Sequence, residues 1–453
     1  MLFLKNFLKT YSMEIEIIAV GGYEEIGANM TAIRIDDTVI LIDMGLYVDK
    51  IVSFGERENI NEIPVQKLYE IGAIPDDRIL EDLKDKVKAI VISHAHLDHV
   101  GATHILAPKY NAPIYASPYT VEILRSLEED AGIVIPNKVK KISPNSKIKV
   151  NGITINFIST THSIPQTVMI DIETKKGHII YSSDFKFDNF PLIGKRPDYD
   201  KLKSIGDEGV IALIVETTRA DEESKSPSEI IAKYMLYDVL SSVDTDGIIV
   251  TTFASHIARL KSLVEISYEL DRKPIFIGKS LGKYLKAAEK LGLYNFSEVS
   301  EIYDNASIYP KVLENIMKER EKYLLIVTGH QGEPGSVLDR LAKDQLPWDF
   351  NNTTVIFANN VIPYPINEAN RKLLEERLRR KGAHIIKDVH VSGHAKSEDH
   401  RMLLKLLRSE YIFPMHGTIT KRAAYVELAE EHGYNLGENI FLLQNGQRKL
   451  LEI

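Results

Sequence analysis

Three histidines and one aspartate lie within six consecutive positions that directly follow an apolar run ending at Ser93. The four residues are His94, His96, Asp98 and His99. Imidazole nitrogens and carboxylate oxygens are the ligands that zinc binds where cysteine is absent. The spacing lets the first two side chains face one metal ion and the last two face a neighbouring ion. The alternative is a polar loop with chance histidines, which 14 histidines in 453 residues make improbable.

A two-metal site needs further ligands from other segments of the chain. His162 follows the predicted strand Ile153–Ser159, and Asp184 and His416 come at the ends of two other apolar runs. A carboxylate between two cations can bridge them, and we expect Asp184 to take that position. Each of these residues taken singly is more often an ordinary loop residue. Together with the histidine cluster, each becomes a candidate metal ligand.

Short runs rich in valine and isoleucine position these residues and predict strands of a largely buried sheet. The predicted strands are Glu14–Val20, Val39–Asp43, Val87–Ser93, Ile153–Ser159 and Ile179–Asp184. An α/β scaffold presents reactive groups at strand ends and in the loops that follow them. Asp43 ends one of these strands, and we expect it to orient a ligand histidine without binding the metal itself.

The pattern changes at about Ser226, where helical stretches begin to alternate with short buried strands. This alternation predicts a parallel α/β unit. From Ala383 to the end of the sequence, strand, loop and helix patterns return with more histidines. Because no linker rich in glycine or serine separates these regions, we expect the middle unit to be a compact insertion.

The composition limits the class of protein. Hydrophobic residues make up 44% and charged residues 26%, which is typical of a globular protein, here with two or three domains. The net charge of −8 argues against a simple nucleic-acid-binding module, although a local basic groove or bound metal ions can still attract phosphate. The absence of cysteine excludes disulfides and thiol nucleophiles and favours a cytoplasmic location.

The sequence predicts no membrane association. No apolar run approaches the roughly 20 residues of a transmembrane helix. Residues 1–12 lack the small-residue cleavage site of a signal peptide. The first patterned strand begins near Met13, and a translation start at either Met1 or Met13 stays open.

The ligand motifs, in this order, resemble the metallo-β-lactamase superfamily. The resemblance implies an α/β fold of the αββα sandwich type that holds two Zn2+ ions per chain, or Mn2+ in their place, at one edge of its sheets. It implies metal binding by His94, His96, Asp98, His99, His162, Asp184 and His416. Bound there, the metal ions would acidify a water molecule and stabilise the developing oxyanion.

A second set of motifs resembles the β-CASP insertion of nucleic-acid-cleaving members, and within that group the ribonuclease J family of the archaeal type. The insertion is opened by Val215–Thr218 and closed by Val389–Ala395. Gly21–Met30 resembles the amino-terminal signature of the ribonuclease J family, and its insert motifs are resembled by Thr252–Ser255, Gly278–Ser280 and Thr328–Pro334. The resemblance divides the chain into a metallo-β-lactamase domain at 1–217 and 383–453 and an inserted β-CASP parallel α/β domain at 218–382. Glu216 stands where bacterial members more often have aspartate, and Ala95 and Leu97 resemble the cleavage-factor branch instead.

The resemblance also implies catalytic and substrate-binding residues. It pairs Glu216 with His394, which suits general acid work because a carboxylate raises the pKa of a histidine. It adds Asp98 to these two as a catalytic residue. The alternative for His394 is a buried or helix-capping histidine. A substrate phosphate would be held by side-chain donors and by close backbone approach at a glycine, within His390, Val391, Ser392, Gly393 and His394.

We therefore expect a zinc-dependent hydrolase, a ribonuclease that binds single-stranded RNA and degrades it from the 5′ end in RNA processing and decay. A 5′ monophosphate is the expected preference, and additional endonuclease activity stays open. One alternative is a DNA-directed or cleavage-factor-type β-CASP endonuclease. Another is an inactive metal-binding scaffold subunit, against which the intact ligand set argues. A homodimer is expected from the family resemblance alone.

Overall fold

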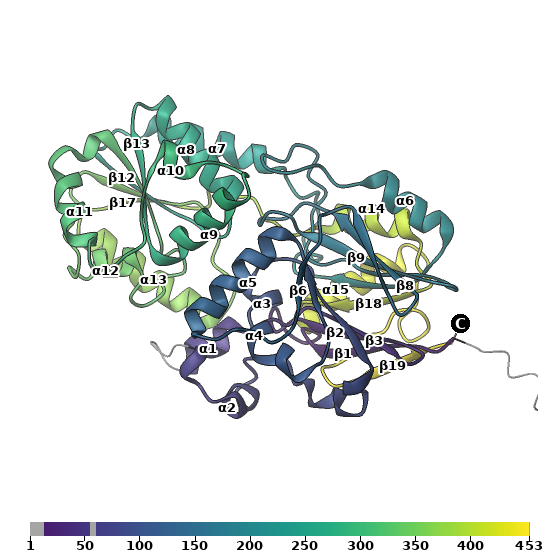
Figure 1. Ribbon diagram of the computed structural model, residues 1–453. Coiled ribbons are helices and arrows are strands. Elements are labelled where there is room, and N and C mark those ends of the chain that lie inside the picture. Colours follow the sequence, from purple (N-terminus) through teal and green to yellow (C-terminus); the bar gives the residue numbers. More distant parts are fainter. Residues whose placement is uncertain (1–12, 55–59, 453) are drawn as a thin grey trace, which may run out of the picture.

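The computed structural model describes residues 13–54 and 60–452. The predictions about a leader segment and about a start at Met1 fall on residues 1–12, which lie outside the described residues. Within the described ranges, the strands form three β-sheets (Figure 1). No described helix is long and apolar enough to cross a membrane.

The first sheet contains seven strands. In spatial order they are β19 (Arg448–Leu451), β1 (Ile15–Gly21), β2 (Met30–Ile35), β3 (Thr38–Ile42), β4 (Val87–Ile92), β5 (Ile114–Ala116) and β6 (Val139–Lys141). The strands from β19 to β3 pair antiparallel, whereas β3 to β6 pair parallel. Parallel pairing requires crossover connections, so the loops after β3 and β4 emerge at the same edge of the sheet.

The second sheet contains six strands. In spatial order they are β18 (Tyr411–Met415), β11 (Val210–Glu216), β10 (Gly177–Tyr181), β9 (Val168–Thr174), β8 (Ile153–Ser159) and β7 (Ser146–Val150). The interior strand β11 is buried at every position, as expected for a strand covered on both faces, whereas the first four residues of the edge strand β7 alternate between half-buried and exposed. β10, β11 and β18 are parallel, so their carboxyl ends also share one edge.

These two sheets pack face to face over one apolar core, to which β1, β3, β4, β8, β9, β10 and β11 contribute. A second core joins the outer face of the second sheet to three helices, α6 (Tyr199–Glu208), α14 (Ser397–Leu407) and α15 (Ile419–Glu430). The outer face of the first sheet is covered by shorter elements and one long helix: α2 (Val65–Glu70), the 3-10 stretch 77–86, α4 (Thr103–Leu106) and α5 (Pro118–Ala131). The layers are therefore helix, sheet, sheet, helix, and the predicted αββα sandwich is confirmed.

The third sheet belongs to the insert and is parallel throughout. Its strands, in spatial order, are β14 (Glu301–Tyr303), β13 (Lys273–Ile277), β15 (Tyr323–Val327), β12 (Gly247–Thr251), β16 (Thr353–Phe357) and β17 (His384–Ile386). The helices of the insert are α7 (Glu229–Ser242), α8 (Ile257–Glu269), α9 (Lys279–Lys290), α10 (Phe296–Val299), α11 (Tyr309–Ile316), α12 (Val337–Ala342) and α13 (Pro365–Arg380). The predicted parallel α/β insertion is confirmed.

Two boundaries differ from the sequence prediction. β17 lies beyond residue 382, where we placed the end of the insert, yet it pairs with β16. A three-residue strand is too short to show a periodicity, so its sheet could not be assigned from sequence. β10 ends at Tyr181 rather than Asp184, because Ser183 has a φ of 54° that an extended strand does not allow.

The insert packs directly against the rest of the molecule. α5 contacts α9, and the hydroxyl of Tyr119 on α5 donates a hydrogen bond to the carbonyl of Tyr284 at 3.1 Å. Figure 1 shows the insert as a second lobe beside the sandwich, with α9 close to α5. This arrangement is consistent with a compact insertion, and a cavity lies between the two lobes.

Candidate metal centre

The seven predicted metal ligands lie together where the carboxyl ends of several strands meet. They come from the loop after β4 and the short helix α3 (Leu97–Val100), and from the segments that follow β8, β10 and β18. The side chains form two groups that share one carboxylate. The first group is His94, His96, His162 and Asp184, and the second is Asp98, His99, Asp184 and His416.

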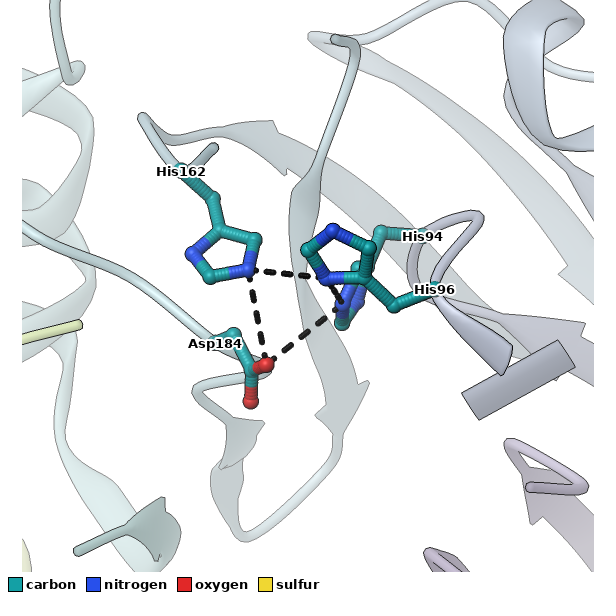
Figure 2. Close-up of side chains that lie close together, drawn as sticks. All are labelled: His94, His96, His162 and Asp184. Carbon is teal, nitrogen blue, oxygen red and sulfur yellow. Dashed lines mark hydrogen bonds and ion pairs between the residues drawn. The ribbon is translucent and has the colours of Figure 1, made fainter. Parts of the chain in front are cut away.

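In the first group, three imidazole rings point toward one another and toward a carboxylate (Figure 2). His96 Nδ1 lies 3.2 Å from His94 Nε2 and 3.0 Å from His162 Nε2. Asp184 Oδ2 lies 3.5 Å from the same nitrogen atoms of His94 and His162. Four potential ligand atoms therefore surround one small volume.

The second group uses the other oxygen of the shared carboxylate. Asp184 Oδ1 lies 3.4 Å from His99 Nε2 and 3.6 Å from His416 Nε2. Asp98 Oδ2 lies 3.7 Å and 3.5 Å from these two nitrogen atoms. Asp184 thus lies between the two groups with one oxygen toward each, which is the arrangement that a bridging carboxylate requires.

The hydrogen bonds at Nδ1 of two rings determine which nitrogen atom faces the ligand groups. His162 Nδ1 lies 2.7 Å from the carbonyl oxygen of Gly393, and a carbonyl can only accept, so the ring proton is on Nδ1 and Nε2 carries the lone pair. His99 Nδ1 lies 2.7 Å from Asp43 Oδ2, which fixes His99 in the same way. In both rings, Nε2 is the atom that faces the group.

Burial and charge also fit a metal cofactor. Asp184 Oδ1 and His416 Nε2 are buried and have no hydrogen-bond partner among the described residues, a costly state that a cation would relieve. Burial lowers the pKa of His96 and His162 well below its usual range, which keeps these rings in the neutral form that binds metal. In His99 burial acts in the same direction, but nearby carboxylates, chiefly Asp184, outweigh it and raise the pKa, so this position favours a positive charge.

Asp43 lies in the position that the sequence predicted, beside a candidate ligand histidine. Its Oδ2 also accepts hydrogen bonds from the hydroxyls of Tyr181 and Ser93, both at 2.8 Å, and its Oδ1 accepts from the Ser93 backbone N–H at 2.7 Å. The carboxylate is fully buried. Four donors hold the Asp43 carboxylate in one orientation. Its hydrogen bond to Nδ1 in turn fixes the orientation of the His99 ring.

Strained backbone accompanies three of these positions. Asp43 and His416 directly follow strands and Ser183 lies two residues after one, and each has a positive φ, of 61°, 51° and 54° respectively. Residues other than glycine rarely adopt this conformation, and such strain clusters at functional sites. The sharp turns bring Asp43, Asp184 and His416 back toward the same point.

A carboxylate–histidine pair lies beside the first group. Glu216 ends β11, and its Oε1 lies 3.4 Å from His394 Nδ1. The backbone N–H groups of Ala395 and Thr218 donate to the two oxygens of Glu216 at 3.2 and 2.8 Å, which holds the carboxylate in place. Burial disfavours a charged histidine here, but Glu216 outweighs it and raises the pKa of His394 above its usual value. His394 Nδ1 is also 3.9 Å from Asp184 Oδ2.

The stretch 390–394 lines the same cavity as the two metal groups. The cavity has a volume of about 670 Å3, and its lining includes Asp98, Asp184, Ser392, Gly393 and His394. The Ser392 hydroxyl accepts a hydrogen bond from the His394 backbone N–H at 3.1 Å, so the oxygen is partly occupied while its own proton stays available.

Gly393 has a contact that sequence reasoning did not predict. A Cβ at this position would lie 2.9 Å from the Cβ of Ser163 and 3.0 Å from Nδ1 of His162. Glycine is therefore required here because the backbone packs against a candidate metal ligand. This reason is separate from the expected close approach of a substrate phosphate to Gly393.

Sequence reasoning missed several supporting residues. The amide of Asn29 donates to the carbonyl of Asp98 at 3.0 Å and lies 3.1 Å from His99 Nε2, and Ser255 Oγ lies 3.2 Å from His96 Nε2. Both residues belong to motifs that carried the family resemblance, so a signal was present. Ser183, 3.1 Å from His94 Nδ1, had no such signal.

Three family models match successive parts of the chain. Residues 73–198 match the beta-lactamase superfamily domain, and residues 245–374 match the ribonuclease J beta-CASP domain. Residues 380–442 match the Zn-dependent metallo-hydrolase RNA specificity domain.

Curated relatives match over nearly the whole length. A ribonuclease J from Methanocaldococcus jannaschii is 46% identical and covers 96% of this chain and 98% of its own. A ribonuclease J from Pyrococcus abyssi is 44% identical over 95% of this chain and 96% of its own, and a ribonuclease J 1 from Streptococcus pyogenes is 30% identical over 96% and 74%. A solved structure of a protein of unknown function from Enterococcus faecalis aligns with a TM-score of 0.65 at 17% identity and covers 97% of this chain and all of that one, which supports the fold alone.

The fold and the matched domains define a metal-dependent hydrolase of the metallo-β-lactamase superfamily that carries a β-CASP insert. With 46% identity over 96% of its length, the chain belongs to the ribonuclease J family. The family prediction from sequence is confirmed, and the most similar of the relatives named here are the archaeal ones.

Proposed function

We propose that this protein is a zinc-dependent ribonuclease that degrades single-stranded RNA from its 5′ end, prefers a 5′ monophosphate and acts in RNA processing and decay. One observation carries the proposal. Members of both candidate metal groups line one cavity together with four residues of the 390–394 stretch, among them His394, the partner of Glu216. These lining residues are His96, Asp98, Asp184, His416, His390, Ser392, Gly393 and His394. The names of the relatives and the RNA specificity domain model support RNA as the substrate.

Two metal ions form the first part of the proposal. The candidate ligands are His94, His96, Asp98, His99, His162, Asp184 and His416. Nitrogen and oxygen ligands without sulfur suit zinc and also admit manganese. Bound there, the ions would supply a hydroxide nucleophile and stabilise negative charge on the phosphate, with Asp98 as a catalytic ligand.

The second part concerns proton transfer by the protein's own residues. Glu216 keeps a proton available on His394, because it raises the pKa of the ring. Cleavage of a phosphodiester at the 3′ oxygen requires that this leaving oxygen take up a proton. We infer that His394 donates it as a general acid while Glu216 holds the ring in position.

The third part concerns selection of the 5′ end. His390, Ser392 and Gly393 precede the proposed general acid by only a few residues and line the cavity with it. A phosphate held by this stretch would lie about one nucleotide from the scissile bond. A pocket fitted to one phosphate would exclude a triphosphate, and this difference is the basis of the proposed preference.

The test uses RNA with a label in the 5′-terminal nucleotide and with a monophosphate, a triphosphate or a hydroxyl at that end. We expect labelled mononucleotides as the first products and the fastest turnover with the monophosphate. Labelled oligonucleotides of several residues as first products would favour an endonuclease instead, and cleavage of DNA in place of RNA would favour the DNA-directed alternative. Equal rates on all three ends would contradict the proposed selection.

Two further predictions accompany this proposal. The homodimer stays a prediction, which sedimentation velocity would test. The cytoplasmic location also stays a prediction, which cell fractionation would test. Neither affects the chemistry proposed for the cavity.

A further inference from the structure

Arg259, in the first turn of α8, is fully buried between the insert and the 390–394 stretch. A guanidinium has five N–H donors, and five acceptors surround this one. They are Oε1 and Oε2 of Glu229, the carbonyl oxygens of Ala358 and Val391, and Nδ1 of His390. One side chain of the insert therefore connects the start of α7, the end of β16 and the stretch proposed to hold a phosphate.

These contacts decide which nitrogen of His390 carries the proton. Arg259 Nη1 lies 3.2 Å from His390 Nδ1, and a guanidinium offers no acceptor and does not lose its proton. Nδ1 must therefore accept this hydrogen bond. Burial and the adjacent cation lower the pKa of His390 to about 2, so the ring is neutral. A neutral ring with an accepting Nδ1 carries its proton on Nε2.

The Nε2–H group of His390 is available to a ligand. His390 lines the cavity together with Ser392, Gly393 and Asp184. Among the hydrogen bonds of the described residues, none involves Nε2 of His390. The ring therefore presents a fixed hydrogen-bond donor, not an acceptor, beside the two candidate metal groups.

We propose that Arg259 is a positioning residue that holds His390 as a neutral Nε2–H donor and thereby gives the cavity its selectivity for a terminal phosphate. This inference rests on the proposed function of the 390–394 stretch. A donor hydrogen-bonds more strongly to an ionised phosphate oxygen than to a hydroxyl, so it separates these two 5′ ends. The other tautomer would present a lone pair to the phosphate and repel it.

The kinetic test is Arg259→Lys. Lysine keeps a positive charge beside Glu229, but one ammonium group cannot reach five acceptors. We expect the KM for 5′-monophosphorylated RNA to rise about tenfold, the scale of one hydrogen bond to a charged group. We expect changes of less than about twofold in kcat, in metal content and in the KM for 5′-hydroxyl RNA, because the lost contact acts only on the terminal phosphate.

The matched control is Glu229→Gln. This variant disturbs the same buried ion pair but keeps the guanidinium that contacts His390. We expect a lower melting temperature and an unchanged preference for the 5′ monophosphate. If both variants lost the preference equally, the effect would come from damage to the buried pair and not from the contact with His390, and the inference would be overturned.

The direct test is nitrogen-15 NMR of the wild-type protein labelled in its histidines, with His390→Gln to assign the signals. We expect His390 Nδ1 to give the signal of an unprotonated ring nitrogen and Nε2 that of a protonated one. A protonated Nδ1 would overturn the inference, and this spectrum decides it even if Arg259→Lys does not fold. If the wild-type protein showed no 5′-end preference, both the proposed 5′-end selection and the role of Arg259 in it would be overturned. If the NMR spectrum still showed the expected tautomer of His390, the failure would lie in the link to selectivity and not in the contact with Arg259.

Discussion

Two parts of the cavity wall, the candidate metal ligands and the 390–394 stretch, are held in place in different ways. The candidate ligands lie on short turns or on the short helix α3 after strands of the sandwich. Within the sandwich, Asp43 is held by Ser93 and Tyr181 and fixes the ring of His99. The 390–394 stretch belongs to no helix or strand, and a side chain of the insert, Arg259, holds its first two residues. The metal side is thus held chiefly from within the sandwich, with Ser255 of the insert 3.2 Å from His96 Nε2. The start of the 390–394 stretch depends instead on contact between the two lobes.

This difference predicts two kinds of mutational effect. Changes on the metal side should remove the chemistry on every substrate, because they alter the ligand groups themselves. Changes at His390 and Ser392 on the phosphate side should alter which RNA end is preferred and should leave metal content intact. The following variants test that separation, from the largest expected effect to the smallest.

Asp184→Asn should have the largest effect, because Asp184 is shared by both ligand groups. We expect loss of most bound metal and a fall in kcat of more than about ten-thousandfold, beyond the effect of roughly 10²- to 10⁴-fold that a single proton-transfer residue has. Metal analysis and turnover of 5′-labelled RNA measure both. Asp221→Asn, an exposed residue outside the ligand groups, is the matched control. Normal metal content in Asp184→Asn would contradict the assignment of Asp184 as a metal ligand shared by both groups.

His394→Ala should lower kcat by about a hundredfold or more, the usual scale for a general acid. Metal content should stay normal, since His394 belongs to neither ligand group. His384→Ala, at an exposed histidine of β17, serves as the control. If His394→Ala lost its metal instead, His394 would have to be reassigned as a ligand.

Asp43→Asn should weaken metal binding by about 10- to 100-fold, as loss of a partner behind a ligand histidine typically does. The amide retains the shape of the carboxylate but not its charge beside His99 Nδ1. Competition with a chelator measures the affinity, and activity should return at high zinc concentration. An affinity equal to that of Asp37→Asn, an exposed control, would argue against the orienting role.

Ser392→Ala should have the smallest effect and should act on substrate choice. Loss of one hydrogen bond to a charged phosphate should reduce the preference for the monophosphate by about tenfold. The rate on 5′-hydroxyl RNA in the same variant is the internal control, since no phosphate contact is lost there. A uniform decrease on all three ends would mean that the hydroxyl supports the loop through the His394 N–H and does not bind phosphate.

Much of the metal side could be predicted because its signals are local. The spacing of His94, His96, Asp98 and His99 is visible in six residues, and the strands that carry Asp43 and His162 are long enough to show an apolar pattern. The turn at Ser183 was not predictable, because a positive φ in a serine leaves no mark on the sequence pattern. The end of β10 was misplaced for that reason.

The contacts between the lobes could not be predicted from patterns. Arg259 lies 131 residues before His390, and a buried arginine on a helix looks like a surface residue in the sequence. The three-residue strands β5, β6, β14 and β17 form because a neighbouring strand offers hydrogen bonds, so they depend on the assembled sheet. Local sequence contains neither kind of information.

Metal content measured together with activity tests the central claim most directly. Purified protein should contain close to two metal ions per chain by mass spectrometry, exhaustive chelation should abolish RNA cleavage, and added zinc should restore it. His96→Ala, which removes one ligand of the first group, should lose metal and activity together. Full activity after exhaustive chelation would contradict the account.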